Sequence, residues 1–289
     1  MDLQGTVIRP PSEADSILLQ VTLGCSHNKC AFCGAYKDKR FAVKSEDVID
    51  RDIAFAKAYC RSQRRLFLCD GDALILPQDK LLRLLAKIRE HLPWITRIGS
   101  YANAKALRRK TPEQLRELKE NGLGILYMGL ESGDAATLAR MRKANPPEEI
   151  IAQGLKARQA GIKLSVTVLL GLAGPERSAE HAIATGEALS RIDPEQAGAL
   201  SLMLIPGTPL HDDWLQGRFT LLEPHELLSE LKTMLLHTKL SRGLFLANHA
   251  SNHLPLKIRL PRDKEAALAF IDQALAGAVP LKPESSRRL

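Results

Sequence analysis

Residues 24–33 read GCSHNKCAFC and directly follow the apolar run ILLQVTL at residues 17–23. The apolar run predicts a buried strand, so the three cysteines lie in a loop at its C-terminal end. Three thiolates within nine residues bind only a compact group. In a four-iron cluster they would leave one iron without a protein ligand, and that iron could bind a substrate or a cofactor. The spacing therefore predicts a metal centre at the end of the first strand.

A strand-then-helix pattern repeats along the chain. Five further apolar runs, at about residues 66–70, 95–100, 125–130, 162–170 and 197–205, alternate with helical segments. These strands are apolar on both faces, as buried parallel strands are. Six such units are too few for a closed eight-stranded barrel. We therefore predict an α/β fold, an open partial TIM-type (β/α)6 barrel with a small α-rich C-terminal appendage.

The predicted domain organisation follows from this pattern. An N-terminal extension covers residues 1–15, the core barrel covers 16–222, and an appendage packed on the barrel covers 223–279. The appendage is expected to contain a helix at 224–238, a short strand near 244–246 and a last helix at 263–275. Residues 280–289 are expected to form a disordered tail.

Glycine-rich or polar segments follow the other predicted strands. They read DGDA at 70–73, SYAN at 100–103, GLESG at 129–133, GLAGPE at 171–176 and PGTP at 206–209. Ligands of βα folds bind at the edge formed by the C-terminal ends of the strands. The cysteine loop and these segments together predict one binding site at that edge.

The strand-end segments resemble those of radical S-adenosylmethionine (SAM) enzymes, in the branch with the Elp3-like and coproporphyrinogen-oxidase-like members. The usual signature has three cysteines separated by three and two residues, with an aromatic residue before the last. This chain has the variant CX4CX2C, and Phe32 is the aromatic residue. Where the coproporphyrinogen-oxidase-like branch often has a further cysteine, this chain has Ala35. The resemblance covers roughly residues 16–210.

The resemblance implies a [4Fe–4S] cluster bound by Cys25, Cys30 and Cys33, and a SAM molecule bound at the strand ends. Asp70-Gly71-Asp72 resembles the motif that holds the SAM ammonium group, with Asp72 as the preferred carboxylate. Glu131 matches the group that holds the ribose hydroxyls, and Lys143 matches a cation that pairs with the SAM carboxylate. The segment from Gly171 to Gly174 resembles the one against which adenine packs. The other residues expected at the cofactor site are Phe32, Ser100, Asn103, Ser132 and Leu172.

The implied function is that of an oxidoreductase. It cleaves SAM reductively to methionine and a 5′-deoxyadenosyl radical, which abstracts hydrogen from an unidentified substrate, with a small molecule as the first choice. A tRNA or a protein is the second choice. Two rivals belong to other classes: a non-catalytic iron–sulfur electron carrier or scaffold, and a zinc-stabilised nucleic-acid-binding module. In the zinc module, His27 would be the fourth ligand.

Composition and net charge limit the classes of partner that this protein could bind. The net charge of +8 permits nucleic-acid binding, but an aromatic content of 4% argues against a stacking platform for single strands. Most basic clusters are expected to be solvated helix ends, and an acidic electron donor such as a flavodoxin or ferredoxin is the expected protein partner. No apolar run reaches the roughly 20 residues of a membrane span, and the five cysteines do not suggest a disulfide scaffold. We therefore expect a cytoplasmic protein.

Two features lie outside the cluster motif. Cys60 and Cys69 are too few for a second four-cysteine cluster, so we expect both to be small buried hydrophobic residues. The polar segment NHASNH at 248–253 is either a solvated loop or a lid that contacts the substrate.

Overall fold

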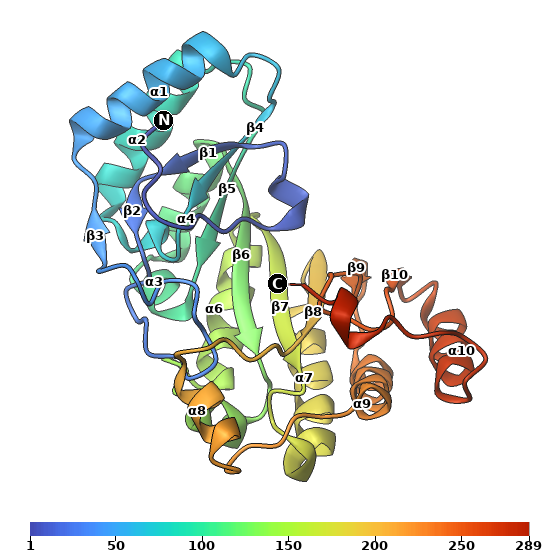
Figure 1. The fold of residues 1–289 in the computed structure, drawn as a ribbon. Helices are drawn as coiled ribbons and strands as arrows, with labels where there is room; N and C mark the ends of the chain where they lie inside the picture. Colours follow the sequence, from blue (N-terminus) through green and yellow to red (C-terminus); the bar gives the residue numbers. More distant parts are fainter. Residues whose placement is uncertain (289) are drawn as a thin grey trace. The chain divides into compact units, whose positions relative to one another are not determined.

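A computed structural model describes residues 1–288 of the chain (Figure 1). Its main sheet has eight strands in an order that follows the sequence, and most of them are parallel; β10 is antiparallel to β9. The strands in order are β1 (Ile17–Gln20), β4 (Arg65–Cys69), β5 (Arg97–Ala102), β6 (Leu123–Glu131), β7 (Lys163–Leu170), β8 (Gln196–Ser201), β9 (Gly243–Leu246) and β10 (Lys257–Leu260). The predicted α/β class and all six predicted barrel strands are confirmed.

Helices separate these strands. They are α1 (Glu46–Tyr59), α2 (Gln78–His91), α3 (Ala104–Arg108), α4 (Pro112–Glu120), α5 (Ala135–Arg140), α6 (Pro147–Gln159), α7 (Ser178–Ile192), α8 (Pro209–Leu215), α9 (Pro224–His237) and α10 (Lys264–Leu275). The sequence does not predict the two short helices α3 and α8. A second, two-stranded antiparallel sheet joins β2 (Thr22–Leu23) to β3 (Ala42–Val43).

The described chain divides into two compact units. Unit 1 contains residues 1–28, 35–128 and 156–164, and unit 2 contains residues 29–34, 129–155 and the chain from 165 onward. These two units do not test the predicted division into extension, barrel, appendage and tail, which stays a prediction.

The core of unit 1 is aromatic. Phe67 of β4 lies edge-on to Tyr101 and Tyr127, with ring centroids 5.0 and 5.6 Å apart. Beneath them the buried carboxylate of Glu13 accepts hydrogen bonds from the Tyr127 hydroxyl and from Arg97, both at 2.5 Å. Because a buried carboxylate is stable only with such partners, Glu13 ties the N-terminal segment to β5 and β6.

The C-terminal part adds strands as well as helices. β9 corresponds to the short strand predicted near residues 244–246, and it pairs with β8. The sequence does not predict β10, which pairs with β9. The second half of the segment 248–253 is not a solvated loop: Ser251, Asn252 and His253 are buried, and the Asn252 amide donates to the carbonyls of Ala199 and Ala247. The segment therefore satisfies backbone carbonyls beside β8. Contact of the segment with a substrate stays a prediction.

Residues 280–288 belong to the predicted disordered tail, which stays a prediction. They contain a short 3-10 helix (Glu284–Ser286), and the buried Arg287 guanidinium donates to the carbonyls of Ser251 and Leu202. The last residue of the predicted tail, 289, lies outside the described residues.

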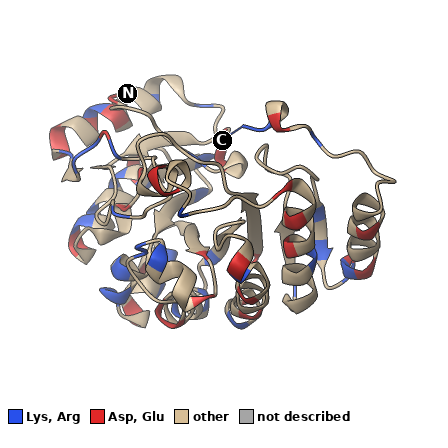
Figure 2. Ribbon diagram, turned by 60° about the horizontal axis from the view of Figure 1, so that its bottom comes forward, with Lys and Arg blue, Asp and Glu red and all other residues tan. Residues whose placement is uncertain are grey.

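Charged residues of both signs occur along the same helices, as Figure 2 shows. The residues behind the net charge of +8 are therefore interspersed with acidic residues along the chain. Among residues 1–288, no helix has both the length and the apolar character needed to cross a membrane.

Candidate functional site

The start of the cysteine loop is fixed by Asp70, the residue after β4. Its buried carboxylate accepts hydrogen bonds from the Gly24 amide at 2.8 Å and from the Gln20 side chain at 3.0 Å. Lys39 completes a buried ion pair at 3.2 Å. The Asp70 carboxylate therefore positions the loop in this structure, and the predicted contact of Asp70 with SAM stays a prediction.

Gly71 allows the loop to approach the end of β4. A Cβ atom at this position would lie 2.9 Å from Cβ of Cys25, closer than real Cβ atoms approach, and 3.1 Å from the Tyr36 ring, tighter than most real contacts. The Gly71 amide also donates to the Gly24 carbonyl at 3.0 Å. Only glycine permits this approach without displacing the loop, which explains its place beside the first cysteine.

Asp72 offers an unused acceptor next to this loop. The residue is fully buried, and Oδ2 accepts a hydrogen bond from the Ser26 hydroxyl. Its Oδ1 atom is buried and has no hydrogen-bond partner among residues 1–288. Burial raises the pKa of Asp72, although Ser26, the Asn103 amide and Lys105 act in the opposite direction. A buried acceptor without a donor is costly, and an ammonium group is a donor that fits it.

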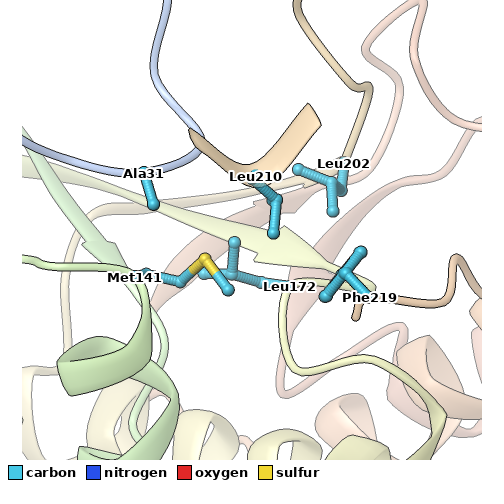
Figure 3. Close-up of a cluster of buried hydrophobic side chains, with 6 residues drawn as sticks. All are labelled: Ala31, Met141, Leu172, Leu202, Leu210 and Phe219. Carbon is cyan, nitrogen blue, oxygen red and sulfur yellow. The ribbon is translucent and has the colours of Figure 1, made fainter. Parts of the chain in front are cut away.

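The segment from Cys30 to Cys33 is held by its backbone in unit 2. The Ala31 amide donates to the Met141 carbonyl at 2.9 Å, and the Ala31 carbonyl accepts from the Leu210 amide at 3.0 Å. Figure 3 shows the side chains of Ala31, Met141, Leu172, Leu202, Leu210 and Phe219 gathered in one buried apolar cluster. Phe32, the predicted aromatic residue of the motif, is half-buried and packs against this cluster. The cluster therefore anchors the part of the loop that carries the last two cysteines.

Lys143 lies near these two cysteines and pairs with Glu131. Its Nζ atom is 2.9 Å from Glu131 Oε1, and the Glu131 backbone has a φ of +67° at the end of β6. Burial alone would lower the pKa of Lys143, but Glu131, Cys30 and Cys33 raise it above its usual value. A cation beside cysteines favours their thiolate form, the form that binds iron. The two residues predicted to bind different parts of SAM are thus each other's partners in this structure.

Two glycines shape the backbone of the turn after β7. Gly171 and Gly174 have φ values of +79° and +73°, which glycine adopts readily. The Leu172 side chain is fully buried in the cluster of Figure 3, so it is not exposed to a ligand. The Gly171 amide donates to Glu230 of α9 at 2.6 Å. The backbone of this turn is therefore the part that a ligand could contact, while the Leu172 side chain packs in the core.

Three predicted cofactor residues have structural partners. The buried Ser100 hydroxyl donates to the Tyr101 carbonyl at 2.9 Å. Asn103 caps α3 through a hydrogen bond from the Ala106 amide at 2.8 Å. The buried Ser132 hydroxyl lies 2.7 Å from Nδ1 of His181. Their predicted contacts with SAM or substrate stay predictions, and the sequence missed Ser26, His181 and Glu230.

The cysteines are all free thiols in the structure. Cys69 is buried as predicted, and burial raises its pKa to about 12, whereas Cys60 is only half-buried. No group of three or more His, Cys, Asp and Glu side chains in residues 1–288 is arranged around one metal ion. The zinc site that includes His27 stays an alternative prediction. In an iron–sulfur cluster the thiolates bind different irons and need not converge on one point.

Comparison with known proteins places the chain in a family. Residues 19–185, more than half of the chain, match the radical SAM superfamily. The heme chaperone HemW of Bacillus subtilis is 23% identical over 222 residues, which are 76% of this chain and 57% of HemW. The chain thus spans little more than half the length of this relative.

Solved structures share the fold at low sequence identity. TsrM from Kitasatospora setae, solved with tryptophan and the SAM analogue aza-SAM, has a TM-score of 0.57 and 18% identity over 70% of this chain and 39% of its own. The coproporphyrinogen III oxidase HemN from Escherichia coli has a TM-score of 0.54 and 18% identity over 76% of this chain and 51% of its own. These likenesses confirm the predicted partial barrel. The chain belongs to the radical SAM superfamily, whose members use a [4Fe–4S] cluster and SAM.

Proposed function

We propose that this protein is an enzyme that cleaves SAM reductively and uses the resulting 5′-deoxyadenosyl radical to abstract hydrogen from a small-molecule substrate. Cys25, Cys30 and Cys33 hold the [4Fe–4S] cluster in this proposal, with the fourth iron left for SAM. The observation that carries the proposal is the buried Asp72 Oδ1 atom, which has no hydrogen-bond partner among residues 1–288. Asp72 directly follows Gly71, the residue that lies against Cys25. When bound, the cluster supplies the electron that breaks the sulfonium bond of SAM.

The chain's own residues bind and orient the cofactor. Asp72 accepts a hydrogen bond from the SAM ammonium group, which supplies the donor that Oδ1 lacks. Lys143 pairs with the SAM carboxylate, and this frees the Glu131 carboxylate to accept from the ribose hydroxyls. The Lys143–Glu131 pair at 2.9 Å keeps both charges compensated before SAM binds, since an unpaired buried charge is costly.

The substrate class and the partners are supported by composition. The low aromatic content, and the occurrence of acidic and basic residues along the same helices in Figure 2, favour a small molecule over tRNA. A modified tRNA or protein is the second choice. The reductant is an acidic electron donor such as a flavodoxin or ferredoxin, which suits a chain of net charge +8. The cytoplasm is the compartment that fits such a donor.

The proposal is tested under anaerobic conditions. The protein is reconstituted with iron and sulfide, reduced with dithionite and given SAM, and 5′-deoxyadenosine is measured by mass spectrometry. We expect product from the native chain and from Cys60→Ala, a matched cysteine outside the motif, and none from Cys30→Ala. A protein that carries a four-iron cluster but binds no SAM would support the electron-carrier reading instead.

A second candidate function comes from the similarity to HemW, which is described as a heme chaperone. In that case the chain would bind heme for transfer, and SAM cleavage would not be its main activity. Titration with heme, followed by absorption spectroscopy, separates the two. Stoichiometric heme binding without production of 5′-deoxyadenosine would favour the chaperone, and SAM cleavage without heme binding would favour the enzyme.

A further inference from the structure

A buried carboxylate from α9 bridges both ends of the turn after β7. Glu230 is 2% exposed. Its Oε1 atom accepts a hydrogen bond from the Gly171 amide at 2.6 Å, and its Oε2 atom accepts from the Ser178 hydroxyl at 2.5 Å. Gly171 begins the turn and Ser178 begins α7 directly after it. One side chain therefore fixes the separation of the two ends of the turn.

The same face of α9 packs on the turn. A Cβ atom at Gly171 would lie 3.0 Å from Cδ2 of Leu227, which is buried and three residues before Glu230. Residues three apart share a helix face. Leu227 and Glu230 thus contact Gly171 together, one by packing and the other by a hydrogen bond.

His181 extends the network to the end of β6. Its Nε2 atom lies 3.5 Å from Glu230 Oε1 and donates to the Leu169 carbonyl at 3.1 Å. With the proton on Nε2, Nδ1 accepts from the Ser132 hydroxyl at 2.7 Å. A neighbouring hydroxyl, that of Thr185, accepts from the Gly133 amide at 2.8 Å. One buried network therefore reaches both strand-end segments to which we assign the nucleoside part of SAM.

This network has a stability cost. Burial lowers the pKa of His181 to about 4, so the imidazole is neutral, and burial raises the pKa of Glu230 to about 7. The basic side chain found within ion-pair distance of Glu230 among residues 1–288 is that of His181, which is neutral. A buried acid without a cation weakens the fold, whereas an apolar residue on α9 would not. The contacts that this acid makes are with the start of the turn after β7 and with the first residues of α7.

We propose that Glu230 is a positioning residue for SAM: from α9, it fixes the Gly171–Gly174 turn in the conformation that binds the nucleoside. This inference rests on the function proposed above. It makes a helix outside the matched residues 19–185 a part of the cofactor site. It also predicts an effect confined to the nucleoside, because Asp72 and Lys143, the residues assigned to the amino-acid end of SAM, bond Ser26 and Glu131 and make none of the bonds of this network.

The test compares binding of 5′-deoxyadenosine, L-methionine and SAM to the reconstituted, unreduced protein by calorimetry. Glu230→Leu should weaken SAM and 5′-deoxyadenosine about tenfold or more, the order expected for losing a buried charge-assisted hydrogen bond, and should leave methionine unchanged. Glu230→Gln can still accept from Gly171 and should stay within about threefold of the native chain. Hydrogen exchange in ligand-free protein should quicken at residues 171–177 in Glu230→Leu only.

The control variant is Ser190→Ala. Ser190 joins α7 to the end of α9 by bonding the Gly186 and His237 carbonyls, away from the turn. It should not change 5′-deoxyadenosine binding. If Glu230→Leu does not fold, Ser178→Ala removes one of the two bonds and should show the same selective loss, smaller in size.

The outcomes separate the two proposals. If the native protein binds SAM and these variants bind it equally well, or lose methionine and nucleoside equally, the positioning role is wrong and the proposed function stands. If the native protein carries a four-iron cluster and does not bind SAM, the proposed function is wrong and the positioning role is lost with it. A selective loss of the nucleoside supports both.

Discussion

The turns after β4 and β7 each depend on one buried carboxylate, but the two carboxylates differ in origin and in charge compensation. Asp70 belongs to its own turn and pairs with Lys39 at 3.2 Å. Glu230 comes from a helix 59 residues after Gly171 and has neutral donors, the Gly171 amide and the Ser178 hydroxyl. The first turn is stabilised by an ion pair with a residue 31 positions away, and the second by hydrogen bonds from uncharged donors to a carboxylate of another helix.

The largest effect is expected from breaking the ion pair. Asp70→Asn leaves the Lys39 ammonium, which is only 7% exposed, without its carboxylate. The loss of one partner of a buried pair costs about 3–5 kcal/mol of unfolding free energy. Urea denaturation at neutral pH measures it. Asp50→Asn removes an exposed pair with Lys87 and should cost about 1 kcal/mol or less. Equal losses in the two variants would show that the Asp70 pair does not stabilise the turn.

The carboxylate of Glu230 should make the free energy of unfolding depend on pH. The folded-state pKa of Glu230 is about 7, above its usual value of 4.5. Its contribution to stability is therefore full below that usual value and is lost as the pH rises through the folded value. The loss is about 3 kcal/mol between pH ~4.5 and pH ~8. Denaturation of the native chain and Glu230→Gln across this range measures it, since the variant should lack this slope. An unchanged slope in the variant would assign the effect to another group.

A smaller effect is expected from closing the space beside Cys25. Gly71→Ala places a Cβ atom 2.9 Å from Cβ of Cys25, so the loop must shift. We expect a loss of about 1–3 kcal/mol and less iron bound per chain after reconstitution. Gly198→Ala is the control, because its added Cβ would have no neighbour closer than 3.9 Å. Full iron loading in Gly71→Ala would show that the loop tolerates the shift.

The smallest expected effect is a change in one hydrogen bond. The Ser178 hydroxyl lowers the pKa of Glu230, so Ser178→Ala should move the pH midpoint of the Glu230 transition upward. The loss of the bond costs about 1 kcal/mol at a pH where Glu230 is ionised. Comparing the pH profiles of this variant and the native chain measures the shift. A midpoint that stays in place would show that Ser178 does not bond the ionised carboxylate in solution.

The sequence by itself determined the strand-end signatures and most of the elements that carry them. The capping box of Thr111 and Gln114 and the cap of α5 by Asp134 are each formed between residues three positions apart. These features succeed because a cap, a glycine turn or an apolar strand is decided by residues a few positions apart. The cysteine motif is local in the same way.

Tertiary structure decided which polar groups have partners. Asp72 and Asp70 look alike in sequence, yet Asp70 is saturated by Lys39, Gly24 and Gln20, whereas Asp72 keeps a free Oδ1 among the described residues. The pairing of Lys143 with Glu131 and the contact of Glu230 with Gly171 also join residues distant in the chain. Hydrogen bonds and ion pairs act over a few ångströms in space, and spacing along the chain sets that distance only within one element or turn. The sequence therefore identified the family and its motifs, and the fold selected the residues that hold the motifs in place.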